Sequence, residues 1–431
     1  MELYPLFLKH PVICTDSRFC PEASIFFALK GENFNGNVFA RQALAKGCAF
    51  AVVDEAAYAN DKRCILVEDV LKTLQDLACF HREQLKTKII GITGTNGKTT
   101  SKELIAAVLQ KRYKTLYTEG NLNNHIGVPL TLLRLTAEHE IAVIEMGANH
   151  PGEIRQLCKL AQPDFGIITN VGKAHLEGFG SFEGVKRSKA ELYEFIARKA
   201  GRIFINADNE HLVEMARKAG VLENKWEKYG ITPDGKWPVT GKLQKDGATL
   251  KMLCRSNQSD FEVHTQLIGD YNAENVLAAL SIGHYFGIPD QEMATALEDY
   301  RPTNKRSQLT VTPKNTLVID AYNANPDSMK QAVRNFAAIE AENKYLILGD
   351  MLELGKESNK EHQSLIETIK SLGFTRVLLV GPEFKVTTHD FLAFNTVSEL
   401  IEALKEQSIE KAWILIKASR GMKLEQITEY L

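Results

Sequence analysis

Short apolar runs alternate with stretches of helical periodicity through the middle of the chain. The apolar runs, each with the helical stretch that follows it, are 88–92 with 99–111, 141–145 with 151–160, and 165–169 with 181–199. Strands that alternate with helices are typical of βαβ units and a mainly parallel sheet. The pattern predicts a central parallel-sheet α/β domain over residues 86–302, with an antiparallel insertion in the polar stretch 240–259.

The pattern on either side predicts two further α/β domains. Before residue 86, apolar runs at 25–29, 49–53 and 65–67 precede a helical stretch at 70–84, which indicates a small N-terminal α/β domain over residues 1–85. After Arg301–Pro302 there are four more apolar runs, most of them followed by a turn and a helix, at 316–320, 345–348, 376–380 and 412–417. They predict a second doubly wound, Rossmann-like domain over residues 303–431, with residues 302–304 as the linker.

Composition narrows the class of protein. The chain has 431 residues, more than one hydrophobic core usually serves, and a formal net charge of −2, which argues against nucleic acid as the main partner. No apolar run reaches the roughly 18 residues of a membrane span, and residues 1–12 lack a signal-peptide pattern. We therefore expect a cytoplasmic protein without stable membrane insertion.

The cysteines are scattered along the chain without a C-x-x-C pair, which argues against a zinc site or a disulfide framework. They are Cys14, Cys20, Cys48, Cys64, Cys79, Cys158 and Cys254.

Residues 91–100 read GITGTNGKTT, between a predicted strand and a predicted helix. Glycines let a loop curl so that its backbone N–H groups point at phosphate oxygens, and the helix N-terminus adds partial positive charge. Lys98 can then reach the terminal phosphates of ATP, and the Thr99 hydroxyl can bind Mg²⁺. Ile92 stands where the common phosphate loop has its first glycine, so a purely structural turn stays open as the alternative. The predicted ATP-binding residues here are Gly94, Thr95, Asn96, Gly97, Lys98, Thr99 and Thr100.

Polar groups also follow the neighbouring predicted strands. Glu145 ends one strand and is a candidate Mg²⁺ ligand, because ligands of a doubly wound sheet lie beyond its carboxyl edge. His175 follows another strand and is either a metal ligand or a hydrogen-bonded loop histidine. Farther on, Asn272 opens a helix and is best explained as its cap, whereas Asn275 can present an amide to a base.

Lys189 falls on the apolar stripe of the predicted helix at 181–199. Lys186 and Arg187 are expected to point elsewhere. A lysine on the inward face is costly unless it is paired or chemically altered, and the alternative is a side chain that extends from the edge of the stripe to solvent.

Together these motifs resemble the Mur ligase family over nearly the whole chain. GITGTNGKTT is similar to the family's own phosphate loop, and residues 145–153 (EMGANHPGE) and 169–175 (TNVGKAH) resemble its Mg²⁺ segments. Residues 322–326 (YNANP) and 349–355 (GDMLELG), with His362, resemble the branch that adds D-alanyl-D-alanine. The family's D-N-P-R signature of diaminopimelate-adding relatives is absent.

The resemblance implies a function and its cofactors. It implies an ATP-dependent ligase that joins D-alanyl-D-alanine to the terminal carboxylate of UDP-MurNAc-tripeptide through an acyl phosphate, in peptidoglycan precursor synthesis. The N-terminal domain would bind the UDP-sugar, the central domain ATP, and the C-terminal domain the acceptor dipeptide. Two Mg²⁺ ions, a carbamylated Lys189 and a monomeric enzyme are expected.

The same resemblance assigns roles to individual residues. Lys98, His175 and Lys189 are the expected catalytic residues, and the expected metal ligands are Thr99, Glu145, His175 and Lys189. Asn272, Asn275, Arg306 and Asp320 would contact ATP. The expected substrate-binding residues are Ser17, Arg18, Lys30, Asn123, Asn124, Asn323, Asn325 and Ser328.

Several alternatives stay open at this point. A relative that adds another amino acid, such as a diaminopimelate- or lysine-adding ligase or a folylpolyglutamate synthetase, would carry many of the same motifs. A P-loop regulatory module would hydrolyse nucleotide without a peptide acceptor, although no N-K-x-D guanine signature is present. Residues 35–37 (NGN) and Ala418 depart from the family pattern, so the detailed uridine contacts are undetermined. The third residue of the tripeptide and the base that deprotonates the acceptor amine are also undetermined.

Overall fold

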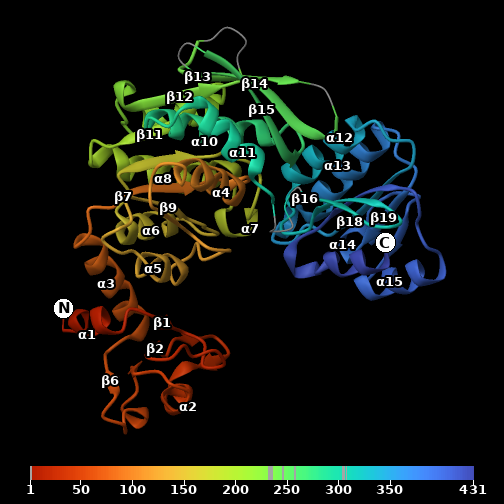
Figure 1. The fold of residues 1–431 in the computed structure, drawn as a ribbon. Helices are drawn as coiled ribbons and strands as arrows, with labels where there is room; N and C mark the ends of the chain where they lie inside the picture. Colours follow the sequence, from red (N-terminus) through yellow and green to blue (C-terminus); the bar gives the residue numbers. More distant parts are fainter. Residues whose placement is uncertain (1, 232–235, 245–246, 257–258, 303–305, 307) are drawn as a thin grey trace. The chain divides into compact units, whose positions relative to one another are not determined.

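The computed structural model describes residues 2–231, 236–244, 247–256, 259–302, 306 and 308–431. The chain forms two compact units. The first comprises Met1–Ile92, Tyr113–Ala148 and Gly152–Phe165, and the second Thr93–Arg112, Asn149–Pro151 and Gly166–Leu431. Helices alternate with mainly parallel strands in both units, which confirms the predicted α/β class (Figure 1).

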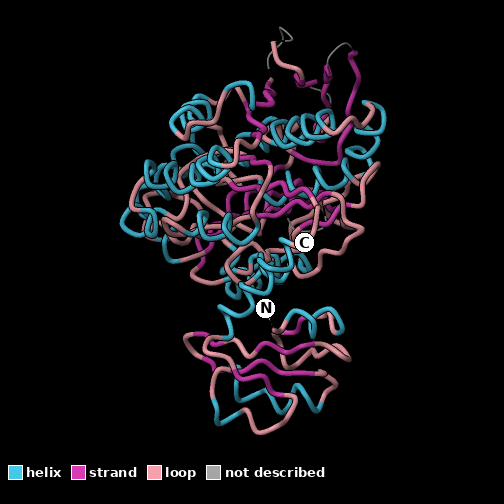
Figure 2. The backbone as a smooth tube through the Cα atoms, turned by 90° about the vertical axis from the view of Figure 1, so that its left-hand side faces the viewer, coloured by secondary structure: helices cyan, strands magenta, loops and turns pink. Residues whose placement is uncertain are grey.

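The N-terminal part of the first unit is built on a four-stranded parallel sheet. Its order is β1 (Ile13–Cys14), β2 (Ile25–Phe27), β5 (Phe50–Val53) and β6 (Cys64–Leu66). Figure 2 shows these short strands, in magenta, running side by side. The three apolar runs predicted here all contain strands. Helix α2 (Ala40–Ala45) contributes Ala40, Ala43 and Leu44 to the apolar cluster of this sheet.

The helical stretch predicted at 70–84 is α3 (Val70–Glu83). Its first turn is capped by Asp69, whose side chain accepts a hydrogen bond from the backbone N–H of Lys72. Leu74, Leu77 and Ala78 are fully buried, as their helical spacing predicts.

The first unit also holds three strands in the order β8 (Thr115–Tyr117), β9 (Ile141–Glu145) and β7 (Lys88–Thr93). They are parallel, and Glu145 is the register partner of Ile92. Glu145 therefore lies at the carboxyl edge of the sheet, beside the strand that runs into the glycine-rich loop.

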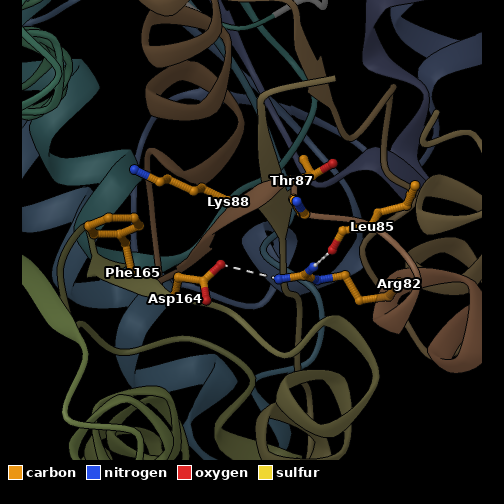
Figure 3. Close-up of a pocket in the computed structure, with 7 residues that line it drawn as sticks. Arg82, Leu85, Thr87, Lys88, Asp164 and Phe165 are labelled. Atoms are coloured by element: carbon orange, nitrogen blue, oxygen red, sulfur yellow. Dashed lines mark hydrogen bonds and ion pairs between the residues drawn. The ribbon is translucent and has the colours of Figure 1, made fainter. Parts of the chain in front are cut away.

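A pocket of about 350 Å³ lies at the other, amino end of β7 (Figure 3). Arg82 donates to Asp164 at 3.2 Å and to the carbonyl of Leu85 at 3.1 Å, and Asp164 also accepts from the backbone N–H of Ile89 at 2.8 Å. Ligands of parallel sheets bind at the carboxyl ends of strands, so we assign this pocket a structural role.

Asp164→Ala should lower the free energy of unfolding of the first unit. It removes the partner of the Arg82 side chain, which is only 10% exposed, and an acceptor for a backbone N–H. Loss of such contacts costs on the order of 2 kcal/mol, measurable by urea unfolding. Glu138→Ala is the matched control, because it breaks the well-exposed pair with Lys114 and should change little. Equal effects of the two substitutions would contradict the assigned role.

In the second unit a sheet runs in the order β10 (Phe165–Ile168), β11 (Arg202–Asn206), β12 (Trp226–Gly230), β13 (Val239–Gln244), β14 (Thr249–Ser256) and β15 (Ser259–Ile268). The last three strands are antiparallel neighbours, which confirms the antiparallel insertion predicted at 240–259 within the described residues. Helix α10 (Asn272–Tyr285) packs against α4 (Lys98–Leu109) (Figure 1).

The C-terminal part of the second unit has a six-stranded sheet. Its order is β16 (Gln308–Val311), β17 (Thr316–Asp320), β21 (Trp413–Lys417), β18 (Lys344–Gly349), β19 (Val377–Val380) and β20 (Leu392–Phe394). Only β16 is antiparallel to its neighbour among these pairs. The four predicted strands are confirmed, whereas the edge strands β16 and β20 were not predicted.

Two apolar clusters show that this C-terminal sheet is covered on both faces. Leu346 and Leu348 pack with α12 (Pro326–Ala338) and α13 (Ser358–Ser371), whereas Ile347 packs with α15 (Val397–Glu406). Alternate residues of a strand point to opposite faces, so the helices lie on the two sides of the sheet. This arrangement confirms the predicted doubly wound domain.

The predicted linker and the helix lengths are the remaining features of the fold. Of the predicted linker 302–304, residues 303 and 304 lie outside the described residues. In the part of the chain that the structure describes, no helix is long and apolar enough to cross a membrane.

Candidate active site

The glycine-rich loop leads from Thr93, at the end of β7, to Lys98, the first residue of α4. Gly94 and Gly97 have φ angles of +148° and +76°, which other residues rarely adopt. Lys98 folds back over the loop, and its Nζ donates to the carbonyls of Gly94 and Thr95 at 2.8 and 3.0 Å. The strand, loop and helix are those that the sequence predicts for a phosphate site.

Residues that follow β10 hold this loop in shape. The backbone N–H of Asn96 donates to Asn170 Oδ1 at 2.9 Å, and the Thr169 hydroxyl donates to the Asn96 carbonyl at 2.6 Å. Thr95 is held in the same way, with its N–H bonded to the Asn170 carbonyl and its hydroxyl accepting from the N–H of Gly172. The loop is therefore fixed by the protein itself, which is favourable for binding an anion without reorganisation.

Asn275 packs against Gly97 of the loop, and Asn272 holds the Asn275 side chain in place. Asn275 Oδ1 accepts from the Ser101 hydroxyl at 2.8 Å, and a Cβ on Gly97 would lie 2.5 Å from the same oxygen. Asn275 Nδ2 donates to Asn272 Oδ1, and Asn272 Nδ2 donates to the Ile268 carbonyl. The interpretation of Asn272 as a helix cap is wrong, because Tyr271 occupies that position and Asn272 is the first helical residue. The contacts of both amides with adenine stay predictions.

The structure brings Lys98, His175 and Lys189 into one region. The pKa of His175 is lowered first by burial, and the charges of Lys98 and Lys189 lower it further against the opposing charge of Glu353. His175 pairs through Nδ1 with Glu353 and has a φ angle of +49°, a strained conformation for a side-chain-bearing residue. A neutral imidazole is the form that can bind a metal.

Lys189 lies on the buried face of α8 (Phe182–Arg198), as predicted. It is 2% exposed, and its Nζ lies 5.3 Å from the centre of the Phe179 ring. The expectation that Lys186 points elsewhere is wrong, since it is also buried. Lys186 pairs with Glu183 and Glu214 at 3.2 and 2.9 Å, so the chemistry of its surroundings differs from that of Lys189.

Glu145 lies in the first unit and is fully buried. Its Oε1 accepts from Asn123 Nδ2 at 2.8 Å, and its backbone N–H donates to the Thr118 hydroxyl. Asn124 Oδ1 accepts from the N–H groups of Ile126 and Gly127, where α5 (Gly127–Leu132) begins. The predicted substrate residues Asn123 and Asn124 thus order the segment beside the predicted metal ligand.

Two of the predicted acceptor residues form a helix cap. Asn325 caps α12 and forms a reciprocal capping box with Ser328. The side-chain Nδ2 of Asn325 takes no part in this cap and donates to Asn96 Oδ1 at 2.7 Å. Asn323 is exposed, and its carbonyl accepts from Lys417 Nζ at 3.1 Å.

Asp320 and Arg306, the predicted ATP residues after residue 302, each contact a charged or aromatic side chain. Asp320 pairs with the buried Lys417. The guanidinium of Arg306 lies 3.8 Å from the centre of the Tyr322 ring, and Arg420 donates to the hydroxyl of Tyr322 at 3.2 Å. Within the described residues, Arg306 Nε has no hydrogen-bond partner.

The predicted UDP-sugar residues lie in the N-terminal part of the first unit. Arg18 forms hydrogen bonds with Asp16, which lower the pKa of that carboxyl to about 2. Lys46 Nζ donates to the carbonyl of Ser17 at 2.9 Å. Lys30 pairs with Asp54 at 3.0 Å, and this pairing raises the pKa of the lysine.

Comparisons with known proteins show the family. A UDP-N-acetylmuramoyl-tripeptide--D-alanyl-D-alanine ligase of Bacillus subtilis is 35% identical over 432 residues, which cover 97% of this chain and 92% of the relative. The enzyme of the same name from Escherichia coli is 34% identical, with coverages of 97% and 93%. The chain belongs to the Mur ligase family.

Family models and solved structures give the same result. The models match residues 11–82 (Mur ligase family, catalytic domain), 92–283 (Mur ligase middle domain) and 305–420 (Mur ligase, glutamate ligase domain). A crystal structure of MurF from Acinetobacter baumannii has a TM-score of 0.85 and 30% identity, covering 97% of this chain and 92% of that chain. MurF of Thermotoga maritima in complex with ADP has a TM-score of 0.84 and 25% identity, with coverages of 97% and 96%.

Each unit contains groups of the kind that can hold a divalent cation. Glu145 is a fully buried carboxylate, Thr99 a buried hydroxyl and His175 an imidazole whose pKa is lowered. Oxygen and imidazole ligands suit Mg²⁺ or a related ion. The buried ammonium group of Lys189 would repel a cation beside it, so this side chain could join such ligands only in an anionic form.

Sequence reasoning missed several residues of this Mur ligase site. The N–H of Lys173 donates to Asp327 at 2.8 Å, and its Nζ pairs with Glu361 at 2.8 Å, an interaction that raises the pKa of the lysine. Glu353, the partner of His175, was also missed. Their signals were available, because Lys173 belongs to the TNVGKAH segment and Asp327 follows the YNANP motif, but no local pattern pairs them.

Lys98→Ala should reduce ATP-dependent turnover by about 10²–10³ while leaving the fold intact, because one electrostatic contact with the transferred phosphoryl group is lost. Steady-state kinetics and circular dichroism check this. Lys111→Ala, which changes a partly exposed lysine two residues beyond the end of α4, is the control. Undiminished turnover in Lys98→Ala would refute the assignment.

Gly97→Ala should weaken ATP binding by about tenfold or more in calorimetry, because its Cβ would displace Asn275 and distort the loop. Gly287→Ala is a matched control. Gly287 has a φ angle of +73°, nearly that of Gly97, but an added Cβ would meet open space. Similar losses of ATP affinity in both variants would show that contact with Asn275 is not the cause.

Proposed function

We propose that this Mur ligase joins D-alanyl-D-alanine to the terminal carboxylate of UDP-MurNAc-tripeptide, with conversion of ATP to ADP and phosphate, in peptidoglycan precursor synthesis. The relatives named UDP-N-acetylmuramoyl-tripeptide--D-alanyl-D-alanine ligase are similar to this chain over nearly their whole length. The observation that carries the proposal within the structure is the contact of Asn96 with Asn325. It joins the phosphate loop to the YNANP segment of the dipeptide-adding branch.

Amide formation needs a better leaving group than hydroxide. The substrate carboxylate attacks the γ-phosphorus of ATP and releases ADP, which forms an acyl phosphate. The amine of the dipeptide then attacks the acyl carbon, phosphate leaves, and the amine loses a proton to a base or to solvent. The first step brings two anions together. We assign Lys98, whose Nζ lies over the loop, to offset that repulsion.

Mg²⁺, when bound, neutralises charge on the phosphates and polarises the phosphoryl group. We assign Thr99, Glu145, His175 and carbamylated Lys189 as its ligands, with two ions per site. Carbamylation adds CO₂ to the neutral amine of Lys189, releases a proton, and converts a buried cation into an anion. His175 is held toward this region by Glu353, which supports its role as a ligand.

The C-terminal residues divide between ATP and the dipeptide. Arg306, with no hydrogen-bond partner for its Nε in the described part of the chain, is assigned to ATP together with Asp320. Asn272 and Asn275 are assigned to the adenine side. Asn323, Asn325 and Ser328 would bind the acceptor, and the exposure of Asn323 beside the capped start of α12 supports this role.

The remaining assignments concern the other substrate and the domains. Ser17, Arg18 and Lys30 would contact the UDP-sugar, and Asn123 and Asn124 its peptide end. The domain bounds 1–85, 86–302 and 303–431 stay proposals, as do the monomeric state and the cytoplasmic location.

Phosphate release with UDP-MurNAc-tripeptide, measured with and without D-alanyl-D-alanine, tests the function. Release should require both substrates and should not occur with glutamate or diaminopimelate as the acceptor. Comparison of tripeptides that end in lysine or diaminopimelate would identify the third residue. Equal nucleotide consumption without peptide or dipeptide, and no joined product, would overturn the proposal.

Lys189→Ala should lower turnover by about 10²–10³, because the proposed anionic ligand is lost. Removal of dissolved CO₂ should lower the activity of the unaltered enzyme, and bicarbonate should restore it. Lys186→Ala is the control, since it changes a buried lysine of the same helix that is paired with Glu183 and Glu214. A Lys189→Ala enzyme as active as the Lys186→Ala control would contradict the carbamate role.

A further inference from the structure

Three cysteine side chains converge in the N-terminal part of the first unit. The sulfur atoms of Cys14, Cys20 and Cys48 all lie within 4.8 Å of one another. Cys14 ends β1, Cys20 belongs to the loop that follows it, and Cys48 lies between α2 and β5. The absence of a C-x-x-C pair argued against a thiol metal site, but spacing along the chain does not show that the fold brings these three sulfur atoms together.

The geometry of the cluster is close to that of metal-bound thiolates. The sulfur atoms of Cys14 and Cys20 are 4.0 Å apart. In a tetrahedral site with metal–sulfur bonds of about 2.3 Å, two sulfur ligands lie about 3.8 Å apart. The pair needs almost no adjustment, and a shift of about 1 Å or less would bring Cys48 to the same spacing.

The backbone around the cluster is fixed by its own hydrogen bonds. The N–H of Ala23 donates to the Gly47 carbonyl, and the N–H of Ala49 donates to the Ser24 carbonyl, both at 2.8 Å. These bonds hold the segment that carries Cys48 beside the loop that carries Cys20. The fold therefore holds the backbone segments that carry these thiols next to one another.

The thiols differ in burial. Cys14 and Cys48 are buried, and burial raises the pKa of Cys14 to about 12 and that of Cys48 above its ordinary range. Cys20 is half-buried, so the cluster is accessible from its side. A cation that binds as a thiolate complex must release the thiol protons to solvent, and soft d¹⁰ ions such as Zn²⁺ and Cu⁺ do this readily.

We propose that Cys14, Cys20 and Cys48 form a binding site for a soft d¹⁰ cation of the Zn²⁺ class, with three sulfur ligands and a fourth position open on the Cys20 side. The three cysteines are not among the magnesium ligands assigned above, and thiolates select a different kind of metal from the carboxylate and hydroxyl groups there.

A bound cation would tie both ends of one functional loop. Residues 15–19 lie between Cys14 and Cys20 and include Ser17 and Arg18. This consequence rests on the proposed function, in which those two residues contact the UDP-sugar: Zn²⁺ should then lower the KM for that substrate. The metal site itself does not depend on that function, so its test is a binding measurement.

The test uses the full chain, reduced and freed of metal, in excess Mg²⁺. Anaerobic addition of Co²⁺ should produce the thiolate-to-cobalt charge-transfer absorption that oxygen and imidazole ligands do not give, saturating at about one ion per chain. Zn²⁺ should displace the cobalt and abolish the band. Zn²⁺ should also raise the thermal unfolding temperature.

Two variants make the result specific. Cys20→Ser, which changes a half-buried residue and should fold, should lose the absorption and the thermal shift. Cys64→Ser should keep both, although Cys64 is also half-buried and packs against the same apolar cluster. If the three thiols are core side chains only, no charge-transfer band will appear. That result, or an unchanged band in Cys20→Ser, would overturn the proposal.

Discussion

The shape of the glycine-rich loop depends on hydrogen bonds to Thr95 and Asn96, and those of Asn96 come from two parts of the chain. The N–H and the carbonyl of Asn96 are held by Asn170 and Thr169 at the end of β10, and its side-chain oxygen accepts from Asn325. Residues after β10 thus hold the backbone of Asn96, and the residue that caps α12 holds its side chain. Buried polar groups are costly to leave unsatisfied, so an alternative loop shape would have to replace several bonds together.

This arrangement is suited to the chemistry proposed for the loop. Phosphorylation of a carboxylate requires two anions to approach, and a preformed set of donors stabilises their meeting without reorganisation. The region contains the cation of Lys98 and a His175 whose pKa is lowered by burial and by nearby positive charge. The buried Lys189 would add to this cationic charge as an ammonium group, which is the physical reason for the carbamate proposed above. The link to Asn325 joins the same loop to the segment assigned to the acceptor.

Local patterns predicted most of the fold and the centre of the site. Strands β7, β9, β17 and β21, and helices α3, α4 and α8, agree with the predicted ranges to within one or two residues at each end, because each has a strong apolar period. The edge strands β16 and β20 were missed, since they are short and only partly buried. Glycine spacing predicted a curled loop between β7 and α4, and the structure has such a loop there, while phosphate binding stays a prediction.

The missed features involve pairing between distant residues. The partners of His175, Lys173 and Asn96 are Glu353, Glu361 and Asn325, each well over a hundred positions away. Lys186 was misjudged for the same reason, because its burial depends on Glu214 of a different helix. Convergence of Cys14, Cys20 and Cys48 likewise depends on the parallel pairing of β1, β2 and β5. No periodicity along the chain contains this information.

The most direct test is a double-mutant cycle between Asn96 and Asn325, measured as kcat/KM for D-alanyl-D-alanine at saturating ATP. Asn96→Ala removes only the side chain, and Asn325→Ser keeps a residue able to cap α12. If their contact joins the loop to the acceptor segment, the double variant should be no less active than the less active of the two single variants. The coupling free energy between the two substitutions should then be about 1 kcal/mol or more. Losses that simply multiply would show that the two residues act independently and would contradict this account.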